Sequence, residues 1–266
     1  MKRETMIDFS TAIRAAFEGG REILDVYDSD FAVETKDDKT PLTLADKRAH
    51  HKIVDVLAKT SLPVLSEEGK AIPYATRAAW PEFWMVDPLD GTKEFVKRNG
   101  EFTVNIALIK DGKATFGVIF VPVKNQLFFG GVGEGAYLIE DFVGDTFAIE
   151  DLRKRGHELP MPKSGNGYVA VGSRSHMSPE TEAFFEELRG RHGDIEVVSM
   201  GSSLKICLVA QGVADIYPRF APTMEWDTAA GHAIAKGAGK NIIDYTTQAE
   251  MRYNKENLLN NWFVVK

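Results

Sequence analysis

Residues 84–108 read WMVDPLDGTKEFVKRNGEFTVNIAL, and the hexad 87–92 inside this stretch decides the fold. Two carboxylates, Asp87 and Asp90, follow directly on the apolar run 83–86, interleaved with a proline, a glycine and a threonine. A strand that ends in clustered acids, with a rigid turn and a helix start behind it, can hold hard cations against a phosphate. The hexad therefore predicts a cation site at a strand end, beside a place for an anion.

The composition is ordinary for a globular protein, since 44% of the 266 residues are hydrophobic and 27% are charged. This length suits one large domain or two smaller layered halves. The net charge of −7 argues against a nucleic-acid partner, because counterion release needs clustered Lys and Arg. Acids gathered in one cleft would also repel an anionic substrate unless cations fill the cleft first.

The single cysteine, Cys207, cannot form an internal disulfide, which fits a reducing compartment. It lies in the apolar run 206–209, so we interpret it as a buried packing residue and not as a nucleophile. Residues 1–17 lack the unbroken apolar core of a signal peptide, and no stretch approaches the roughly 18–20 apolar residues of a membrane span. We expect a soluble, cytoplasmic protein, with a peripheral position on the inner face of the cell membrane as the variant.

The apolar spacing predicts helices and strands that fall into two groups. In the first group we expect helices over 6–27 and 43–59 and strands over 62–65, 83–86, 103–109, 115–121, 126–130 and 137–139. In the second we expect strands over 168–171, 196–199, 215–218 and 262–265, alternating with helices over 180–189, 204–211 and 228–238. This pattern predicts a layered α/β protein with an α+β half at 1–145, a connecting excursion at 146–165 and an α/β half at 166–266.

Four acids stand at the ends of predicted strands or at helix starts: Glu67, Asp87, Asp90 and Asp227. Hard oxygen ligands in this number suit Mg²⁺ or Mn²⁺, and the carbonyl of Leu89 could add another oxygen. Each acid has a plainer interpretation when taken alone. The pair 87/90 could lie on a solvated turn, Glu67 could belong to a charged loop, and Asp227 could be a helix N-cap.

Gly91 and Thr92 open a short segment, 93–97, that is a plausible helix. The exposed N–H groups at a helix start bind phosphate oxygens. Metals and a helix start on the same anion would neutralise its charge from two sides.

Read together, the strings at 65–68, 87–92 and 226–231 resemble the inositol-monophosphatase-like, lithium-sensitive Mg²⁺ phosphatases. The strings at 173–176, 201–205 and 217–220 are similar to the bacterial CysQ-type 3′(2′),5′-bisphosphate nucleotidases within that family. The resemblance covers nearly the whole chain. It implies an α-β-α-β-α sandwich and hydrolysis of adenosine 3′,5′-bisphosphate to AMP and phosphate, with two or three Mg²⁺ ions that Mn²⁺ could replace. It also implies inhibition by Li⁺ and a role in sulfur metabolism, where the enzyme would clear the nucleotide by-product of sulfate activation.

Carried over to this chain, the resemblance implies metal ligation by Glu67, Asp87, Leu89 (through its carbonyl), Asp90 and Asp227. It implies that Asp46 and Thr92 activate the attacking water, and that Gly91, Thr92, His176, Ser202, Lys205 and Arg219 bind the substrate. A threonine hydroxyl is too weak an acid to act alone at neutral pH, but beside a carboxylate it can orient a water and pass on its proton.

Several alternatives stay open at this point. Asp46 could cap the helix that follows Thr43, His176 could cap the helix that begins near Pro179, Lys205 could be an exposed helix cation, and Arg219 a surface strand residue. The activity could be that of an inositol-1-phosphatase or a broad sugar phosphatase, which would use the same metals. A protein that only senses a nucleotide or a metal is a third reading, but it has no need for a water-activating pair.

Overall fold

The nearly continuous apolar runs of 82–90, 103–110 and 113–121 form the centre of a seven-stranded sheet. The computed structural model describes residues 9–27, 33–35, 41–163, 165–173 and 177–266. Along the sheet lie β3 (Val64–Ser66), β4 (Glu82–Asp90), β5 (Thr103–Lys110), β6 (Lys113–Val121), β7 (Gln126–Gly131), β8 (Gly135–Ile139) and β9 (His157–Glu158). The strands β3 and β4 run parallel, and every other neighbouring pair is antiparallel.

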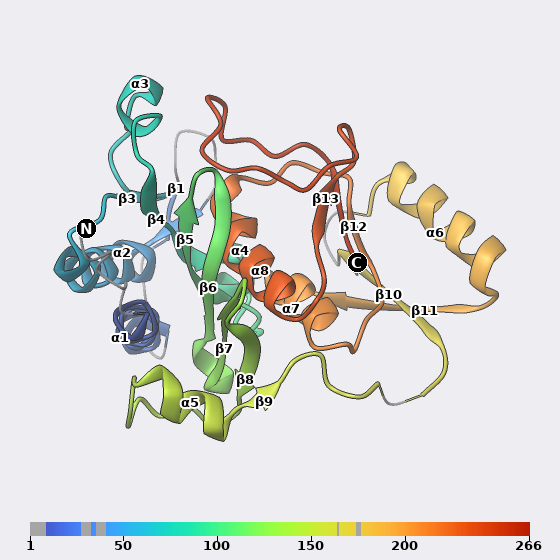
Figure 1. The fold of residues 1–266 in the computed structure, drawn as a ribbon, viewed down its shortest axis with the longest axis horizontal. Coiled ribbons are helices and arrows are strands. Elements are labelled where there is room, and N and C mark those ends of the chain that lie inside the picture. Colours follow the sequence, from blue (N-terminus) through green and yellow to red (C-terminus); the bar gives the residue numbers. More distant parts are fainter. Residues whose placement is uncertain (1–8, 28–32, 36–40, 164, 174–176) are drawn as a thin grey trace.

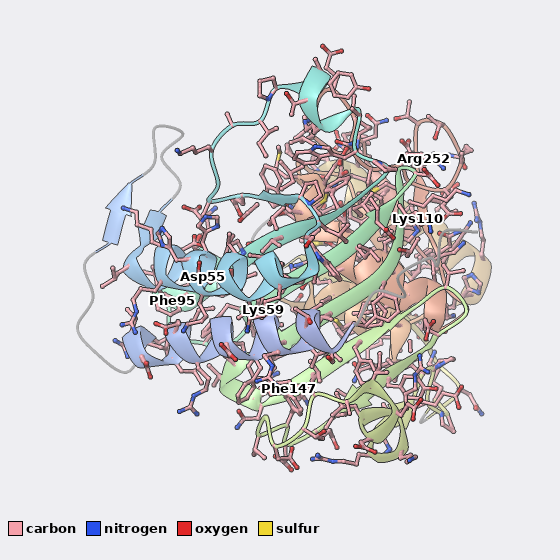
Figure 2. All side chains as sticks on the ribbon, turned by 60° about the vertical axis from the view of Figure 1, so that its left-hand side comes forward. Asp55, Lys59, Phe95, Lys110, Phe147 and Arg252 are labelled. Atoms are coloured by element: carbon pink, nitrogen blue, oxygen red, sulfur yellow. The ribbon has the colours of Figure 1, made fainter. Side chains whose placement is uncertain are left out.

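Helices cover both faces of this sheet because its side chains point alternately to either side. Trp84 and Val86 join the apolar cluster under α1 (Ser10–Tyr27) and α2 (Leu44–Leu57). Phe83 and Met85 join the cluster under α7 (Leu204–Ala210) and α8 (Glu225–Gly237). Figure 2 shows α1 and α2 side by side across the sheet.

A second, smaller β layer lies beyond α7 and α8 (Figure 1). It contains the parallel pair β10 (Tyr168–Ser173) and β11 (Ile195–Met200), and a sheet in which β14 (Phe263–Val265) lies between β12 (Tyr217–Arg219) and β13 (Ile242–Asp244). The helix α6 (Pro179–His192) covers the outer side through Phe185 and Leu188. The layers therefore run α-β-α-β-α, as the resemblance implies.

Short elements complete the described chain. They are β1 (Val33–Thr35) paired with β2 (Pro41–Thr43), α3 (Tyr74–Arg77), α4 (Thr92–Val96) and α5 (Ile149–Arg155). The sequence indicated α4 but missed the others, β9 and β13, because elements of two to seven residues carry too little periodicity to detect. The predicted excursion 146–165 contains α5 and β9, and β9 extends the edge of the large sheet.

The apolar core runs through the boundaries proposed between 1–145 and 166–266. Ala230 and Ile234 of α8 belong to the same cluster as Ile119 and Phe128 of the large sheet. Cys207 lies in that cluster with 1% of its surface exposed, which confirms it as a packing residue. Among the described residues, no helix is both long and apolar enough to cross a membrane.

Candidate active site

A bulge in β4 brings Asp87 and Asp90 to the same face of the sheet. In a regular strand, residues three apart point to opposite faces. Here Asp87 is opposite Asn105 and Asp90 is opposite Thr103, so three steps along β4 match two steps along β5. The extra residue restores a common direction, and Leu89 turns instead into the core under α1 and α2. Both acids therefore face the layer of α7 and α8.

Three carboxylates meet at this face from three separate segments. Glu67, Asp87 and Asp227 each offer an oxygen within 4.8 Å of those of the other two. Glu67 follows directly on β3, and its N–H donates to the carbonyl of Val86 at 3.1 Å. This hydrogen bond seats Glu67 beside Asp87. The charged-loop interpretation of Glu67 therefore gives way to a place in a shared acidic cluster.

Asp227 reaches the cluster from the first turn of α8. The predicted start of this helix at Thr228 is wrong, and the alternative interpretation of Asp227 as its N-cap does not hold. The helix begins at Glu225, and Met224 is the N-cap. The Asp227 carboxylate accepts a hydrogen bond from the Met224 N–H at 2.8 Å. One side chain thus helps to cap the helix and also joins the acidic cluster.

The electrostatics of the cluster fit a divalent cation. Burial, then the nearby Glu67 and Asp90, raise the pKa of Asp87 well above its usual value. Burial, Asp90 and Glu67 do the same for the pKa of Asp227. Acids that repel one another in a site of low dielectric need a proton or a cation to neutralise them. Carboxylate oxygens are the ligands that Mg²⁺ and Mn²⁺ prefer, so the donor set suits these ions.

Asp90 is held by neutral donors and lies outside the 4.8 Å group of the described acids. The backbone N–H of Ser203 donates to its carboxylate at 2.6 Å, and the Asn105 amide does so at 3.3 Å. The hydroxyls of Thr103 and Ser203 donate to the side-chain oxygen Oδ1 of Asn105 at 3.0 and 2.9 Å. This buried network ties β5 to the start of α7 through Asp90.

The predicted water-activating residues flank the cluster. Asp46 is buried in the first turn of α2, and its charge helps to raise the pKa of Asp87, so it faces the same site. Thr92 is the first residue of α4 and follows Gly91, whose φ of 93° lies in the left-handed region that favours glycine. Because α4 has only five residues, its dipole adds little, and any anion there would depend mainly on the exposed N–H groups.

A cavity of about 150 Å³ opens next to the acids and is lined from both halves of the chain. Four predicted substrate residues line it together with Asp90 and Asp227: Gly91, Ser202, Lys205 and Arg219. The other two predicted substrate residues are not found among the described residues that line the cavity. Thr92 is not among the lining residues, and His176 lies outside the described part of the chain.

Lys205 is buried and not the exposed helix cation of the alternative interpretation. Only 8% of its surface is exposed, and its Nζ donates to the carbonyl of Ser202 at 2.7 Å. Burial lowers the pKa of Lys205 to about 8, although the charge of Asp90 opposes that change. Arg219 is half-buried at the end of β12 and donates to the carbonyl of Pro222 at 3.2 Å. Two cationic side chains therefore lie beside the acidic cluster.

The structure identifies the N-cap of α6 but not that of α2. Ser178 caps α6, since its side chain accepts a hydrogen bond from the N–H of Thr181 at 3.2 Å. The alternative role of His176 as a cap of this helix lies outside the described residues. The helix α2 begins at Leu44, next to Thr43, whose side chain lies outside the described ones.

Sequence reasoning missed the side chains that orient the acids. A detectable signal existed for Asn105, because it is an amide at an inward position of a strand that is otherwise almost entirely apolar. No comparable signal marked Ser203 or Glu225, whose roles depend on segments about 30 to 110 residues away. Glu94, which lines the cavity, also carried no signal beyond its place in a helix start.

Comparison with known proteins agrees with this geometry. The sequence profile of the Inositol monophosphatase family matches residues 4–264. The chain is 41% identical over 254 residues to a protein of Salmonella typhimurium named 3′(2′),5′-bisphosphate nucleotidase CysQ, covering 94% of this chain and 96% of that one. For the protein of the same name from Escherichia coli K12 the identity is 42%, with the same coverage.

Solved structures show the same fold. The crystal structure of CysQ from Bacteroides thetaiotaomicron, described as a bacterial member of the inositol monophosphatase family, has a TM-score of 0.91 and 48% identity, and the match covers 98% of both chains. A Staphylococcal inositol monophosphatase with bound 2′-AMP has a TM-score of 0.72 at 22% identity, covering 97% of this chain and 88% of that one. At that identity the likeness concerns the fold alone.

Proposed function

Because this chain belongs to the inositol monophosphatase family, we propose that it is a 3′(2′),5′-bisphosphate nucleotidase, a Mg²⁺-dependent phosphoric monoester hydrolase that converts adenosine 3′,5′-bisphosphate to AMP and phosphate. The observation that carries the proposal is that Asp227 belongs both to the cluster of three carboxylates and to the lining of the cavity, which also contains Lys205 and Arg219. Relatives that carry this activity in their names match over 94% of the chain. The proposed compartment is the cytoplasm. No observation on the described surface supports the peripheral membrane position.

Each group has a distinct part in the proposed reaction. Glu67, Asp87 and Asp227, with Asp90 and the Leu89 carbonyl, hold two or three Mg²⁺ ions. When bound, these ions lower the pKa of a water molecule and neutralise charge on the phosphoryl group. Thr92 acts together with Asp46 to orient the attacking water and to pass on its proton. Water displaces the ester oxygen in line, so a covalent phospho-enzyme is not required.

The cavity explains the choice of substrate. Lys205 and Arg219 supply positive charge for the phosphate that is not cleaved, and Gly91 and Ser202 line the same cavity. A volume of about 150 Å³ is small for a whole nucleotide, since drug-sized ligand sites span about 300–1,000 Å³. We infer that the cavity takes a phosphate and part of the sugar, while the base lies outside it.

A phosphate-release panel tests the proposal. We expect release from adenosine 3′,5′-bisphosphate with Mg²⁺, no release without a divalent cation, inhibition by Li⁺, and a large loss in Asp227→Asn. Inositol 1-phosphate is the rival substrate, because an inositol phosphatase or broad sugar phosphatase would share the acids but has less reason to place Lys205 and Arg219 beside them. Equal or better turnover of inositol 1-phosphate would overturn the substrate, and no release at all would favour a sensor.

A further inference from the structure

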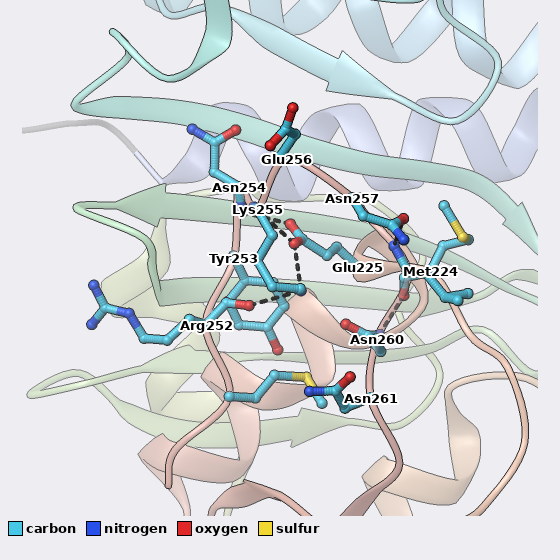
Figure 3. A network of polar contacts seen from close by, with 12 residues as sticks. Met224, Glu225, Arg252, Tyr253, Asn254, Lys255, Glu256, Asn257, Asn260 and Asn261 are labelled. Atoms are coloured by element: carbon cyan, nitrogen blue, oxygen red, sulfur yellow. Dashed lines mark hydrogen bonds and ion pairs between the residues drawn. The ribbon is translucent and has the colours of Figure 1, made fainter. Parts of the chain in front are cut away.

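The segment 252–261 holds the first turn of α8 through a network of polar contacts (Figure 3). We call this segment the clamp. Glu225, the first residue of the helix, is fully buried. Its carboxylate accepts hydrogen bonds from the N–H of Asn254 at 2.5 Å, the N–H of Lys255 at 3.0 Å and the Lys255 Nζ at 2.6 Å. One buried charge thus fixes two residues of the segment to the helix start.

Asn260 fixes the other side of the same turn. Its amide donates to the carbonyl of Met224 at 2.7 Å and to the hydroxyl of Thr228 at 3.1 Å. The N–H of Glu225 donates to the carbonyl of Leu258 at 2.9 Å. The N-cap Met224 is therefore held from outside by Asn260, and its own N–H donates to the Asp227 carboxylate at 2.8 Å.

The clamp is itself anchored to the first half of the molecule. Arg77, a buried residue of α3, donates to the side chain of Asn254 at 2.9 Å and to the carbonyls of Lys255 and Glu256 at 2.6 and 2.7 Å. The amide of Asn254 donates back to the carbonyl of Arg77 at 2.8 Å. The segment therefore presents a fixed surface to Glu225.

From these contacts, we propose that Glu225 is a positioning residue that sets the affinity of the acidic cluster for divalent cations by fixing Asp227. The inference rests on the proposed function, in which Asp227 is a metal ligand. Stability alone is a poor reason for this arrangement, because burying an ion pair costs as much as it gains and apolar residues of similar volume serve as well. Fixing the direction of a ligand is the task that groups behind metal ligands perform elsewhere.

The experiment measures Mn²⁺ binding by the loss of the free-ion electron paramagnetic resonance signal, so turnover is not the only readout. Glu225→Gln keeps the volume but presents an N–H₂ group to donors. We expect the Kd of this variant for Mn²⁺ to rise about 10-fold, the lower end of the effect of changing a group behind a metal ligand, because Glu225 acts on Asp227 through the helix start and not by a direct hydrogen bond. At saturating Mg²⁺, its KM for the nucleotide should stay within about twofold of the wild type, because the cavity residues are untouched.

The matched control is Asn241→Ala. The side-chain oxygen of Asn241 lies 2.8 Å from Nε2 of His232, in the middle of α8, and accepts a hydrogen bond from the N–H of Ile242 at 2.9 Å. This variant loses hydrogen bonds away from the first turn of α8 and should bind Mn²⁺ as the wild type does. Both variants can lower the unfolding temperature of the metal-free protein. If only Glu225→Gln also weakens Mn²⁺ binding, the loss of affinity comes from the position of Asp227 and not from lower stability.

Unchanged Mn²⁺ affinity in Glu225→Gln, or equal weakening in the control, would overturn the inference. If Glu225→Gln does not fold, Lys255→Met serves instead, since the Lys255 side chain is 35% exposed. It removes the charged partner but leaves both backbone donors, and a weakening of a few-fold is expected; wild-type affinity overturns the inference. A wild type that binds no Mn²⁺, or Asp227→Asn that binds it normally, contradicts the proposed function instead.

Discussion

Neutral groups as well as charged ones determine the pKa of Asp90. Burial raises its pKa, while Lys205, Asn105 and the N–H of Ser203 each act to lower it. The side-chain oxygen Oδ1 of Asn105 also accepts hydrogen bonds from the hydroxyls of Thr103 and Ser203. Removing this one amide would leave several buried polar atoms with fewer partners.

We therefore expect Asn105→Ala to lower the free energy of unfolding by about 1–3 kcal/mol, the cost of leaving buried polar groups unsatisfied. Urea titration followed by circular dichroism measures it. Asn99→Ala is the matched control, because Asn99 accepts one hydrogen bond, from Glu101 at 2.9 Å, on an exposed turn. Its cost should stay within about 0.5 kcal/mol. Equal costs for the two variants would show that the network has no special value.

Lys205 should discriminate between substrates by their second phosphate. We expect Lys205→Met to lower kcat/KM for adenosine 3′,5′-bisphosphate about 10- to 150-fold, equivalent to a charged hydrogen bond of about 1.5–3 kcal/mol. Adenosine 3′-monophosphate, which lacks the second phosphate, should lose much less. The exposed Lys97→Met serves as a control for the loss of one charge. A uniform loss on both substrates would remove the reason for assigning Lys205 to that phosphate.

At the scale of elements, α8 lies so close to β6 that the contact requires glycine. A Cβ added at Gly117 would lie 2.2 Å from the carbonyl oxygen of Ala230. Gly117→Ala should therefore destabilise the protein by about 1–3 kcal/mol, the usual cost of overpacking. Gly190→Ala in α6 is the control, because nothing lies within 4 Å of its added Cβ, and it should stabilise the helix by about 1 kcal/mol. Thermal or urea unfolding measures the stability of both variants. A Gly117→Ala protein as stable as the wild type would mean that α8 can move away from β6.

The middle of α8 carries a pH-dependent contribution to stability. Burial lowers the pKa of His232 to about 4 from its usual 6.5, so the folded protein holds the ring neutral. Its contribution is fully present above pH 6.5 and is lost as the pH falls toward 4, by up to about 1.4 kcal/mol per unit. His232→Gln should remove this slope. Free energies of unfolding measured between about pH 4.5 and 7 should converge for the two proteins at the acid end, and parallel curves would contradict the assignment.

Long strands and amphipathic helices could be predicted from the sequence because their periodicity extends over many residues. Three features could not. The bulge that turns Asp87 and Asp90 to one face appears only in the register of β4 against β5. The start of α8 at Glu225 depends on partners in 252–261. Lys205 is buried because α7 lies between two β layers, which a local pattern does not reveal. The acids were found by type and spacing, and their supports depend on tertiary contacts.

For the whole molecule, the continuous core predicts how the chain unfolds. The two proposed halves, 1–145 and 166–266, share one apolar cluster, and α8 packs on the sheet of the first half. We expect one cooperative transition in urea, with tryptophan fluorescence and far-ultraviolet circular dichroism coinciding. Tryptophans at 84 and 226 report on the large sheet and on α8, so variants that keep only one of them follow each region. Two separate transitions would show that the halves are autonomous.

The order of β12, β14 and β13 has a consequence for biosynthesis. Residues 263–265 form the middle strand of that sheet, and both of its neighbours come earlier in the chain. Until the ribosome has made residues 263–265, no strand joins β12 to β13. Arg219, which lies opposite Phe263, then lacks its neighbouring strand. This β layer therefore cannot be completed step by step along the chain, because its middle strand, residues 263–265, is the last of the three to be made.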